Sequence, residues 1–235
     1  MIPQVQYDKS SALFSPDGRL VQVEYARESV KRGSISIGVC YNNGIVLIST
    51  RQISSSLMKP ESVEKIFQID DHIGIAISGM TADAKFLIDK ARLEAQINVS
   101  TYDEPIGVEY LTKRVCDTIY SYTQSGGFRP LGTSLLIAGK ENGIPRLFET
   151  DPSGTSFEWK ATVIGSNREQ VMAYLEQGYT DNMNIEQTVL LVLDALNETK
   201  IGIHDIEIVQ VEDCYVKFSK DGIKKFVEKF RSKYE

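Results

Sequence analysis

The sequence predicts an α+β fold built on antiparallel sheets. Segments dense in β-branched residues come in pairs joined by short turns, which is the pattern of β-hairpins. Two stretches with apolar residues at helical spacing follow, and the same order of strands and helices then occurs a second time. Strands and helices that are grouped apart, without regular alternation, indicate antiparallel sheets with helices packed on them.

The first element is a turn followed by an amphipathic helix. Residues 15–18 read SPDG, in which proline presets the second turn position and glycine tolerates conformations that other residues avoid. From Arg19 onward apolar side chains recur at helical spacing, and Gly33 occupies the position of a C-terminal stop. The helix could cover a sheet of its own domain or pack against a neighbouring copy of the chain.

Two hairpins are expected next. The first contains Asn42, Asn43 and Gly44 between its strands, residue types that accept the positive φ of tight turns. The second turns at Asp70 and Asp71, where the paired carboxylates indicate turn chemistry in preference to catalysis. The strands of these hairpins are predicted at 34–41 with 45–49 and at 66–69 with 73–78.

The remaining elements follow from the same two periods. Apolar residues at helical spacing predict one helix over 84–95 and another over 108–122, with Asp103 and Pro105 at the start of the second. Strands are predicted at 133–138, 146–150, 156–159, 161–164, 206–211 and 215–218, and helices at 168–177, 185–199 and 221–230.

Composition limits the classes of function. The chain has 235 residues, of which 42% are hydrophobic and 25% charged, and no linker-like tract divides it; these features predict a single domain over 1–235. The net charge of -6 argues against non-specific nucleic-acid binding. No apolar run is long enough to span a membrane and no secretion signal is visible, so we expect a cytoplasmic protein without membrane partners.

The sequence contains no pattern that predicts a metal site or a cofactor. Cys40, Cys116 and Cys214 are odd in number and far apart, which favours free thiols in the core. His72 and His204 are not spaced for metal binding with each other or with the cysteines. A lone histidine in a turn is usually solvated.

Five motifs taken together resemble one family. In chain order they are YDKSSALFSPDGRLVQVEYARESVKRGS, SVEKIFQIDDHIG, ISGMTADAK, YTQSGGFRPLG and LFETDPSGTSFEWKATVIGS. They resemble proteasome α subunits, most closely the archaeal type, over nearly the whole chain. The resemblance implies a four-layer αββα sandwich of two antiparallel sheets, the fold of N-terminal-nucleophile hydrolases. It also implies that residues 1–33 form a gate tail, a turn and a helix.

The same resemblance implies a function. Such a chain is a non-catalytic subunit of the proteasome core particle, which gates substrate entry, templates assembly of the β ring and docks an activator in protein degradation. The implied partners are other α subunits in a seven-membered ring, proteasome β subunits, an AAA ATPase or other activator that binds through its C-terminal tails, and unfolded protein substrates in transit.

The resemblance assigns a docking pocket to Lys65, Gly33 and Gly79. A terminal carboxylate needs a cation together with backbone donors that it can approach closely, and glycine exposes such donors. The alternative for Lys65 is that its ammonium simply extends to water from the start of an apolar strand.

The resemblance also assigns a gate. Tyr7, Asp8, Pro16 and Tyr25 match residues that cluster between adjacent subunits and hold the tails away from the pore. Asp8 can accept hydrogen bonds from tyrosine hydroxyls, and Pro16 fixes the turn whose displacement moves the tail. Arg129 either supports this cluster or lies on an ordinary surface loop.

Two other functions remain as alternatives. In the first, cleavage after Gly33 exposes Ser34 as the nucleophile of a self-processed hydrolase. Lys65 matches one catalytic residue of such enzymes, but Thr50 stands where their acid is expected, and cleavage would remove the first helix. No catalytic residue is therefore predicted. The second alternative, a free-standing α+β binding domain, requires a monomeric chain.

Overall fold

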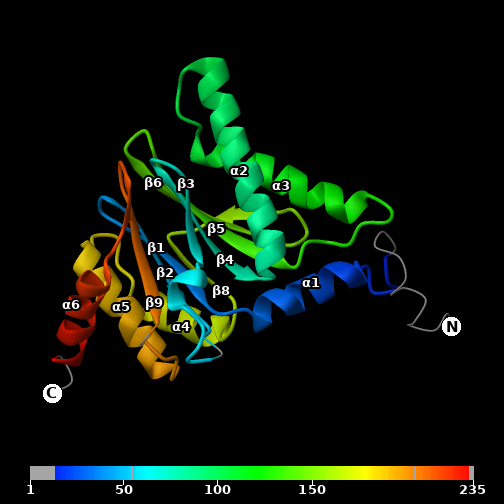
Figure 1. Cartoon of the computed structure of the whole chain (residues 1–235). Helices are drawn as coiled ribbons and strands as arrows, with labels where there is room; N and C mark the ends of the chain where they lie inside the picture. Colours follow the sequence, from blue (N-terminus) through cyan, green and yellow to red (C-terminus); the bar gives the residue numbers. More distant parts are fainter. Residues whose placement is uncertain (1–13, 54, 204, 233–235) are drawn as a thin grey trace.

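Two stacked antiparallel sheets form the centre of the structure, and helices cover their outer faces (Figure 1). The computed structural model describes residues 14–53, 55–203 and 205–232. Each sheet has five strands, in the orders β10-β9-β2-β1-β8 and β3-β4-β5-β6-β7. The predicted α+β class and the four-layer sandwich implied by the family resemblance are therefore confirmed.

The strands of the first sheet are β1 (Ser36–Tyr41), β2 (Gly44–Thr50), β8 (Ala161–Ile164), β9 (Ile206–Val211) and β10 (Tyr215–Lys217). Those of the second sheet are β3 (Ile66–Asp70), β4 (Ile73–Gly79), β5 (Thr133–Glu141), β6 (Ile144–Thr150) and β7 (Ser156–Glu158). All of the pairings within both sheets are antiparallel.

Apolar side chains fill three layers between these elements. In β2, Ile45 and Leu47 point into the core between the sheets, whereas Val46 and Ile48 point into the core under the helices. The strand therefore reads as an unbroken apolar run, because both of its faces are buried. One outer core lies under α4 (Arg168–Gly178), α5 (Ile185–Glu198) and α6 (Lys220–Arg231), and the other under α2 (Thr81–Tyr102) and α3 (Val108–Gln124).

Helix α1 (Val21–Arg32) lies at one end of the sandwich, where it contacts β4 and β5 (Figure 1). Val23, Ala26 and Val30 are buried in this contact. The apolar face of the helix thus packs on its own chain. A short 3₁₀ helix, Pro60–Ser62, interrupts the loop between β2 and β3.

Two local predictions about the turns are wrong. Asp103 does not start α3; it ends α2 in the left-handed region at φ 55°, a conformation that aspartate tolerates better than most residues. The β1–β2 turn closes without positive φ at Asn42, Asn43 or Gly44.

The left-handed turn residues lie in another hairpin. Asn142 and Gly143 have φ of 52° and 79° and join β5 to β6, both of which extend beyond the predicted strand ends. The Asn-Gly pair is the usual signal for such a turn.

The cysteines are free but not equally placed. Cys116 is buried and Cys40 is partly buried, as expected of core thiols, whereas Cys214 is exposed in the turn between β9 and β10, so the prediction of a core position for it is wrong. None of the helices within the described ranges is long and apolar enough to cross a membrane.

Candidate gate and tail-docking site

The turn that precedes α1 has the predicted form. The amide of Gly18 donates to the carbonyl of Ser15 over 2.8 Å, and Gly18 has φ of 74°. The amide of Ser15 in turn donates to the carbonyl of Arg19 over 2.8 Å, which closes the loop around Pro16. A positive φ at the last position of the loop explains why glycine stands there.

Two of the four predicted gate residues can be located. Pro16 is exposed in this turn, and Tyr25 lies on α1 with 54% of its surface exposed. Both are accessible on the surface of the chain, as a contact with another copy requires. Tyr7 and Asp8 lie outside the described residues.

An ion pair fixes the outer face of α1. The Arg27 guanidinium donates from Nε and Nη2 to both carboxylate oxygens of Asp151, each over 2.9 Å, and also donates to Glu24. Burial alone would raise the pKa of Asp151, but the hydrogen bonds from Arg27 and Ser153 outweigh it and hold the pKa below its ordinary value. Asp151 begins the turn after β6, so the position of α1 depends on a residue 124 positions away.

Two glycines make the contact at the C-terminal end of α1. A Cβ on Gly33 would lie 2.4 Å from the Gly79 amide nitrogen and 2.4 Å from Ser78 Oγ, far inside van der Waals contact. Helix α1 ends at Arg32 with Gly33 as its C-cap, so the predicted stop is confirmed; because Gly33 has φ of -68°, glycine is needed there for space and not for a left-handed conformation. Gly79 has φ of 100°, and a Cβ there would lie 2.2 Å from the carbonyl oxygen of Gly132.

Arg129 is linked through Asp83 to Gly132, whose carbonyl oxygen lies against Gly79. It donates to both carboxylate oxygens of Asp83 over 2.6 and 2.8 Å, and Asp83 also accepts the Gly132 amide over 2.8 Å. Burial would raise the pKa of Asp83, but these donors hold it below its ordinary value. Asp83 stands in the first turn of α2, where a negative charge is also favoured by the helix dipole. Arg129 thereby holds the loop before β5 against α2.

Lys65 is buried, so the alternative of an ammonium extended to water is wrong. Only 5% of its surface is exposed; its amide donates to Glu207 Oε2 over 2.8 Å, and its carbonyl accepts the Ile77 amide. Burial lowers the pKa of Lys65 to about 8, although the Glu207 carboxylate opposes the shift. Because Lys65 pairs with Ile77, it lies at the end of the sheet where Gly79 also lies.

Glu207 connects several cations at this end. It is 1% exposed and accepts hydrogen bonds or ion pairs from Arg51 over 2.8 Å and Lys217 over 2.9 Å, besides the Lys65 amide. Burial would raise the pKa of Glu207, but these donors outweigh it and lower the pKa. The carboxylate is therefore held in its charged form within the sandwich.

Of the three residues considered for the hydrolase alternative, two line the same cavity. Ser34 and Thr50 line a cavity of about 510 Å³ beside Gly33, but Lys65 is not among its lining residues. Gly33 is held by its own backbone bonds, because its amide donates to Val30 and its carbonyl accepts from Ser166. Thr50 supplies no carboxylate to support a nucleophile.

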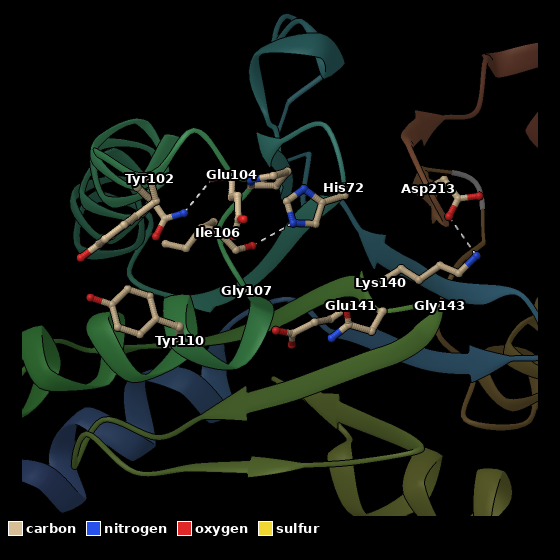
Figure 2. A pocket seen from close by; sticks show the side chains of 13 residues that line it. His72, Tyr102, Glu104, Ile106, Gly107, Tyr110, Lys140, Glu141, Gly143 and Asp213 are labelled. Carbon is tan, nitrogen blue, oxygen red and sulfur yellow. Dashed lines mark hydrogen bonds and ion pairs between the residues drawn. The ribbon is translucent and has the colours of Figure 1, made fainter. Parts of the chain in front are cut away.

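A cavity of about 710 Å³ contains none of the predicted site residues (Figure 2). It lies at the opposite end of the sandwich, between the α2–α3 loop and the tips of hairpins. His72 lines it and is only 18% exposed, with Nε2 2.9 Å from the carbonyl oxygen of Ile106, so the expectation of a solvated histidine is wrong. Lys140 pairs with Asp213 across its rim over 3.0 Å.

Fold and site together define a class: stacked-sheet αββα sandwiches in which an N-terminal turn and helix pack at the end of the sheets. Residues 30–211 match the family model described as proteasome subunit, and residues 7–28 match the model of the N-terminal signature of A-type proteasome subunits. The chain belongs to the proteasome subunit family and is of the α type. The α-type signature supports a ring subunit without catalytic activity.

Curated relatives agree with this assignment. The proteasome alpha subunit of Methanosarcina barkeri is 53% identical over 211 residues, which cover 90% of this chain and 85% of the relative. The protein of the same name from Methanosarcina acetivorans is 48% identical over an alignment that covers 100% of this chain and 98% of the relative. That of Methanocaldococcus jannaschii is 50% identical over 97% of this chain and 90% of the relative. The resemblance to the archaeal type is thus confirmed.

The charged partners of the predicted residues lie far from them in the sequence. Asp83 accepts hydrogen bonds from Arg129, and Asp151 accepts them from Arg27. Glu207 accepts one from the Lys65 amide. The two residues of each pair are at least 46 positions apart. Asp83 and Asp151 stand within the family motifs, so an acid opposite each motif arginine was a usable signal. Glu207 lies in an apolar strand, where a single carboxylate was the only indication.

Proposed function

We propose that this chain is a non-catalytic α-ring subunit of a cytoplasmic proteasome core particle, and that the end carrying Gly33 gates entry and docks an activator's C-terminal tail. The observation that carries the proposal is the packing of Gly33 on Gly79. Backbone atoms in such close contact cannot move independently. A ligand that displaces the end of β4 must therefore displace the end of α1, and with it the turn that leads to the tail.

Lys65, Gly33 and Gly79 form the proposed pocket for the tail. A terminal carboxylate is stabilised by a charged donor and by backbone amides that side chains do not cover. Lys65 supplies a cation at neutral pH, because its pKa of about 8 lies above that pH. Its burial in the isolated chain means that the carboxylate must reach into the protein, where electrostatic attraction is stronger than in water.

The gate is proposed to form between copies. Tyr7, Asp8, Pro16 and Tyr25 of adjacent subunits would cluster when the gate is open, with Arg129 supporting the cluster through the loop before β5. In this proposal the single domain over 1–235 assembles into a seven-membered ring, and residues 1–33 act as its gate segment. The ring stacks on proteasome β subunits and admits unfolded protein substrates.

Three features support a role without catalysis. Thr50 lacks the carboxylate that a nucleophile would need, and Ser34 is joined to Gly33, which is held by hydrogen bonds on both sides. Cleavage there would also detach α1, whose Arg27 is paired with Asp151. Intact mass of the mature chain tests the point, because loss of the residues before Ser34 would favour the self-processed hydrolase instead.

Lys65→Ala tests the pocket in the particle assembled with its β partner. We expect activator-stimulated peptide hydrolysis to fall at least about tenfold, the effect of losing one charged hydrogen bond, while native mass shows unchanged assembly. Lys160→Ala is the matched control, because Lys160 is an exposed lysine paired with Asp181 at the other end of the sandwich. Undiminished stimulation in Lys65→Ala would remove Lys65 from the pocket.

A further inference from the structure

The cavity between the α2–α3 loop and the hairpin tips is negatively charged. It measures about 710 Å³, and small-molecule sites measure about 300 to 1,000 Å³. Its acids are Glu104, Glu141 and Asp213, and Lys140 is the only lysine or arginine in this described lining. Lys140 pairs with Asp213 over 3.0 Å, which leaves two carboxylates unmatched within the lining. A cation that enters the cavity therefore gains electrostatic stabilisation.

The carboxylate of Glu141 can be reached from the cavity and is incompletely paired. Its side chain is 29% exposed, and Oε1 lies against the backbone of Gly107, where a Cβ would come within 2.5 Å of it. Among the residues that the structure describes, no group donates a hydrogen bond to Oε2. Arg146 Nη1 lies 3.8 Å from Oε2, but the same guanidinium also pairs with Glu109 and Glu158. One guanidinium thus faces three carboxylates, and negative charge is in excess here.

Two tyrosine rings supply the second element of a cation site. Tyr102 ends α2 and Tyr110 lies in the first turn of α3; both line the cavity, with 67% and 52% of their surfaces exposed. Figure 2 shows them on one side of the cavity, with Lys140 and Asp213 on the other. The face of an aromatic ring attracts an ammonium group, and aromatic rings line many sites that bind alkylated ammonium ions. The rings and the carboxylates therefore favour the same kind of ligand.

The positions of the unmatched acids indicate which cation fits. In the part of the chain that the structure describes, no three His, Cys, Asp or Glu side chains are grouped closely enough to hold a metal ion. Glu104 lies in the loop between α2 and α3, whereas Glu141 ends β5, so the two carboxylates stand on different elements. A single ammonium group would match only one of them. A flexible chain that carries two or more ammonium groups can match both, and its second contact gains from the first.

We propose that this cavity binds a linear polyamine, with one ammonium group at Glu141 beside the tyrosine rings and another at Glu104. The site lies at the end of the sandwich away from Gly33, and it does not depend on the docking or the gate proposed above. A lysine side chain of another protein carries the same alkylammonium group, so the test separates the two sources.

The test measures binding to the purified full chain by isothermal titration calorimetry. The probes are spermidine, which has three amines, and two single amines, butylamine and Nα-acetyl-lysinamide. We expect spermidine to bind at least about tenfold more tightly than either single amine, the effect of one further charged hydrogen bond. Glu141→Gln should weaken spermidine binding about tenfold for the same reason. Tyr110→Leu, which removes one ring, should weaken it about two- to fivefold.

Glu169→Gln is the matched control, because Glu169 is an exposed acid on α4 that does not line this cavity, and its substitution changes the net charge equally. It should bind spermidine as the wild type does. Thermal unfolding without ligand checks that Glu141→Gln remains folded, and Tyr110→Leu, at an exposed position, keeps the test valid if it does not.

Two results would overturn the inference. Spermidine binding that is the same in Glu141→Gln and in the wild type would reflect general attraction to the net charge of -6 and not this cavity. Nα-acetyl-lysinamide that binds as tightly as spermidine, and that depends on Glu141, would mean that the cavity takes single alkylammonium groups such as a lysine side chain of another protein.

Discussion

The end of the sandwich that carries Gly33 and the end that carries the 710 Å³ cavity differ in what fills them. At the first end, backbone packs directly on backbone, and a Cβ at Gly33 or Gly79 would overlap its neighbours. At the second end, hairpin tips and a helix connection surround open space lined by charged side chains (Figure 2). A Cβ added to Gly143 at that end would meet no atom within 4 Å. Tightly packed backbone transmits displacement, whereas open space absorbs it.

The largest effect is expected from substituting a glycine of the packed end. Gly79→Ala places a Cβ 2.2 Å from a backbone oxygen at φ of 100°, which we expect to cost about 3 kcal/mol or more in the free energy of unfolding. Gly143→Ala at φ of 79° has only the backbone penalty, about 1 to 2 kcal/mol. Urea unfolding of the two purified variants compares them. Equal costs would mean that the packed end yields as easily as the open one.

The second largest loss of stability is expected from removing the negative charge of Asp83. Asp83→Asn weakens the contacts with Arg129 and the Gly132 amide, and we expect a loss of about 1 to 3 kcal/mol at neutral pH. The exposed Asp213, which pairs with Lys140 at the open end, provides the control, and Asp213→Asn should cost less than about 1 kcal/mol.

The pH dependence of stability supplies a second readout for Asp83. Because folding lowers its pKa, its contribution is present above the ordinary value of 3.8 and is lost as pH falls through the lower folded value. The difference between wild type and Asp83→Asn should therefore shrink below about pH 4. A difference that is constant across this range would show that the charge of Asp83 is not what stabilises the loop.

The smallest effect is expected from titrating Lys65. Its pKa of about 8 means that the ammonium is present below that pH and is lost above it. Stimulation by an activator should therefore weaken several-fold between pH 7 and pH 9, with a midpoint above 8 because a docked carboxylate favours the cation. Basal hydrolysis of a small peptide by the same particle corrects for changes at the β subunits. A flat ratio of stimulated to basal rate would argue against docking at Lys65.

Much of the fold could be predicted from local pattern. Strands such as β2 are apolar along their whole length because both faces are buried, and α2 carries its buried Ala84, Leu87 and Ile88 at helical spacing. Errors fell where tertiary context decides the conformation, as at Asp103 and in the turn at Asn42. There a residue type permits a backbone geometry but does not require it.

The site could be predicted only as a set of positions. The family resemblance indicated Lys65, Gly33 and Gly79, and the structure brings the two glycines into contact. It could not indicate that Lys65 is buried beside Glu207, because that contact joins residues 142 positions apart. Nor could it indicate that Arg51 donates to the same carboxylate, because Arg51 and Glu207 are 156 positions apart.

Helix α1 has the geometry of a lever. It is fixed at its C-terminal end by the contact of Gly33 with Gly79, and its 12 residues extend about 18 Å from there toward the turn around Pro16. A rotation of about 5° at Gly33 would displace the far end by about 1.6 Å, more than half the length of a hydrogen bond. A small rotation at the glycines would thereby be magnified at the turn around Pro16, and the ion pair of Arg27 with Asp151 along the helix would have to yield with it.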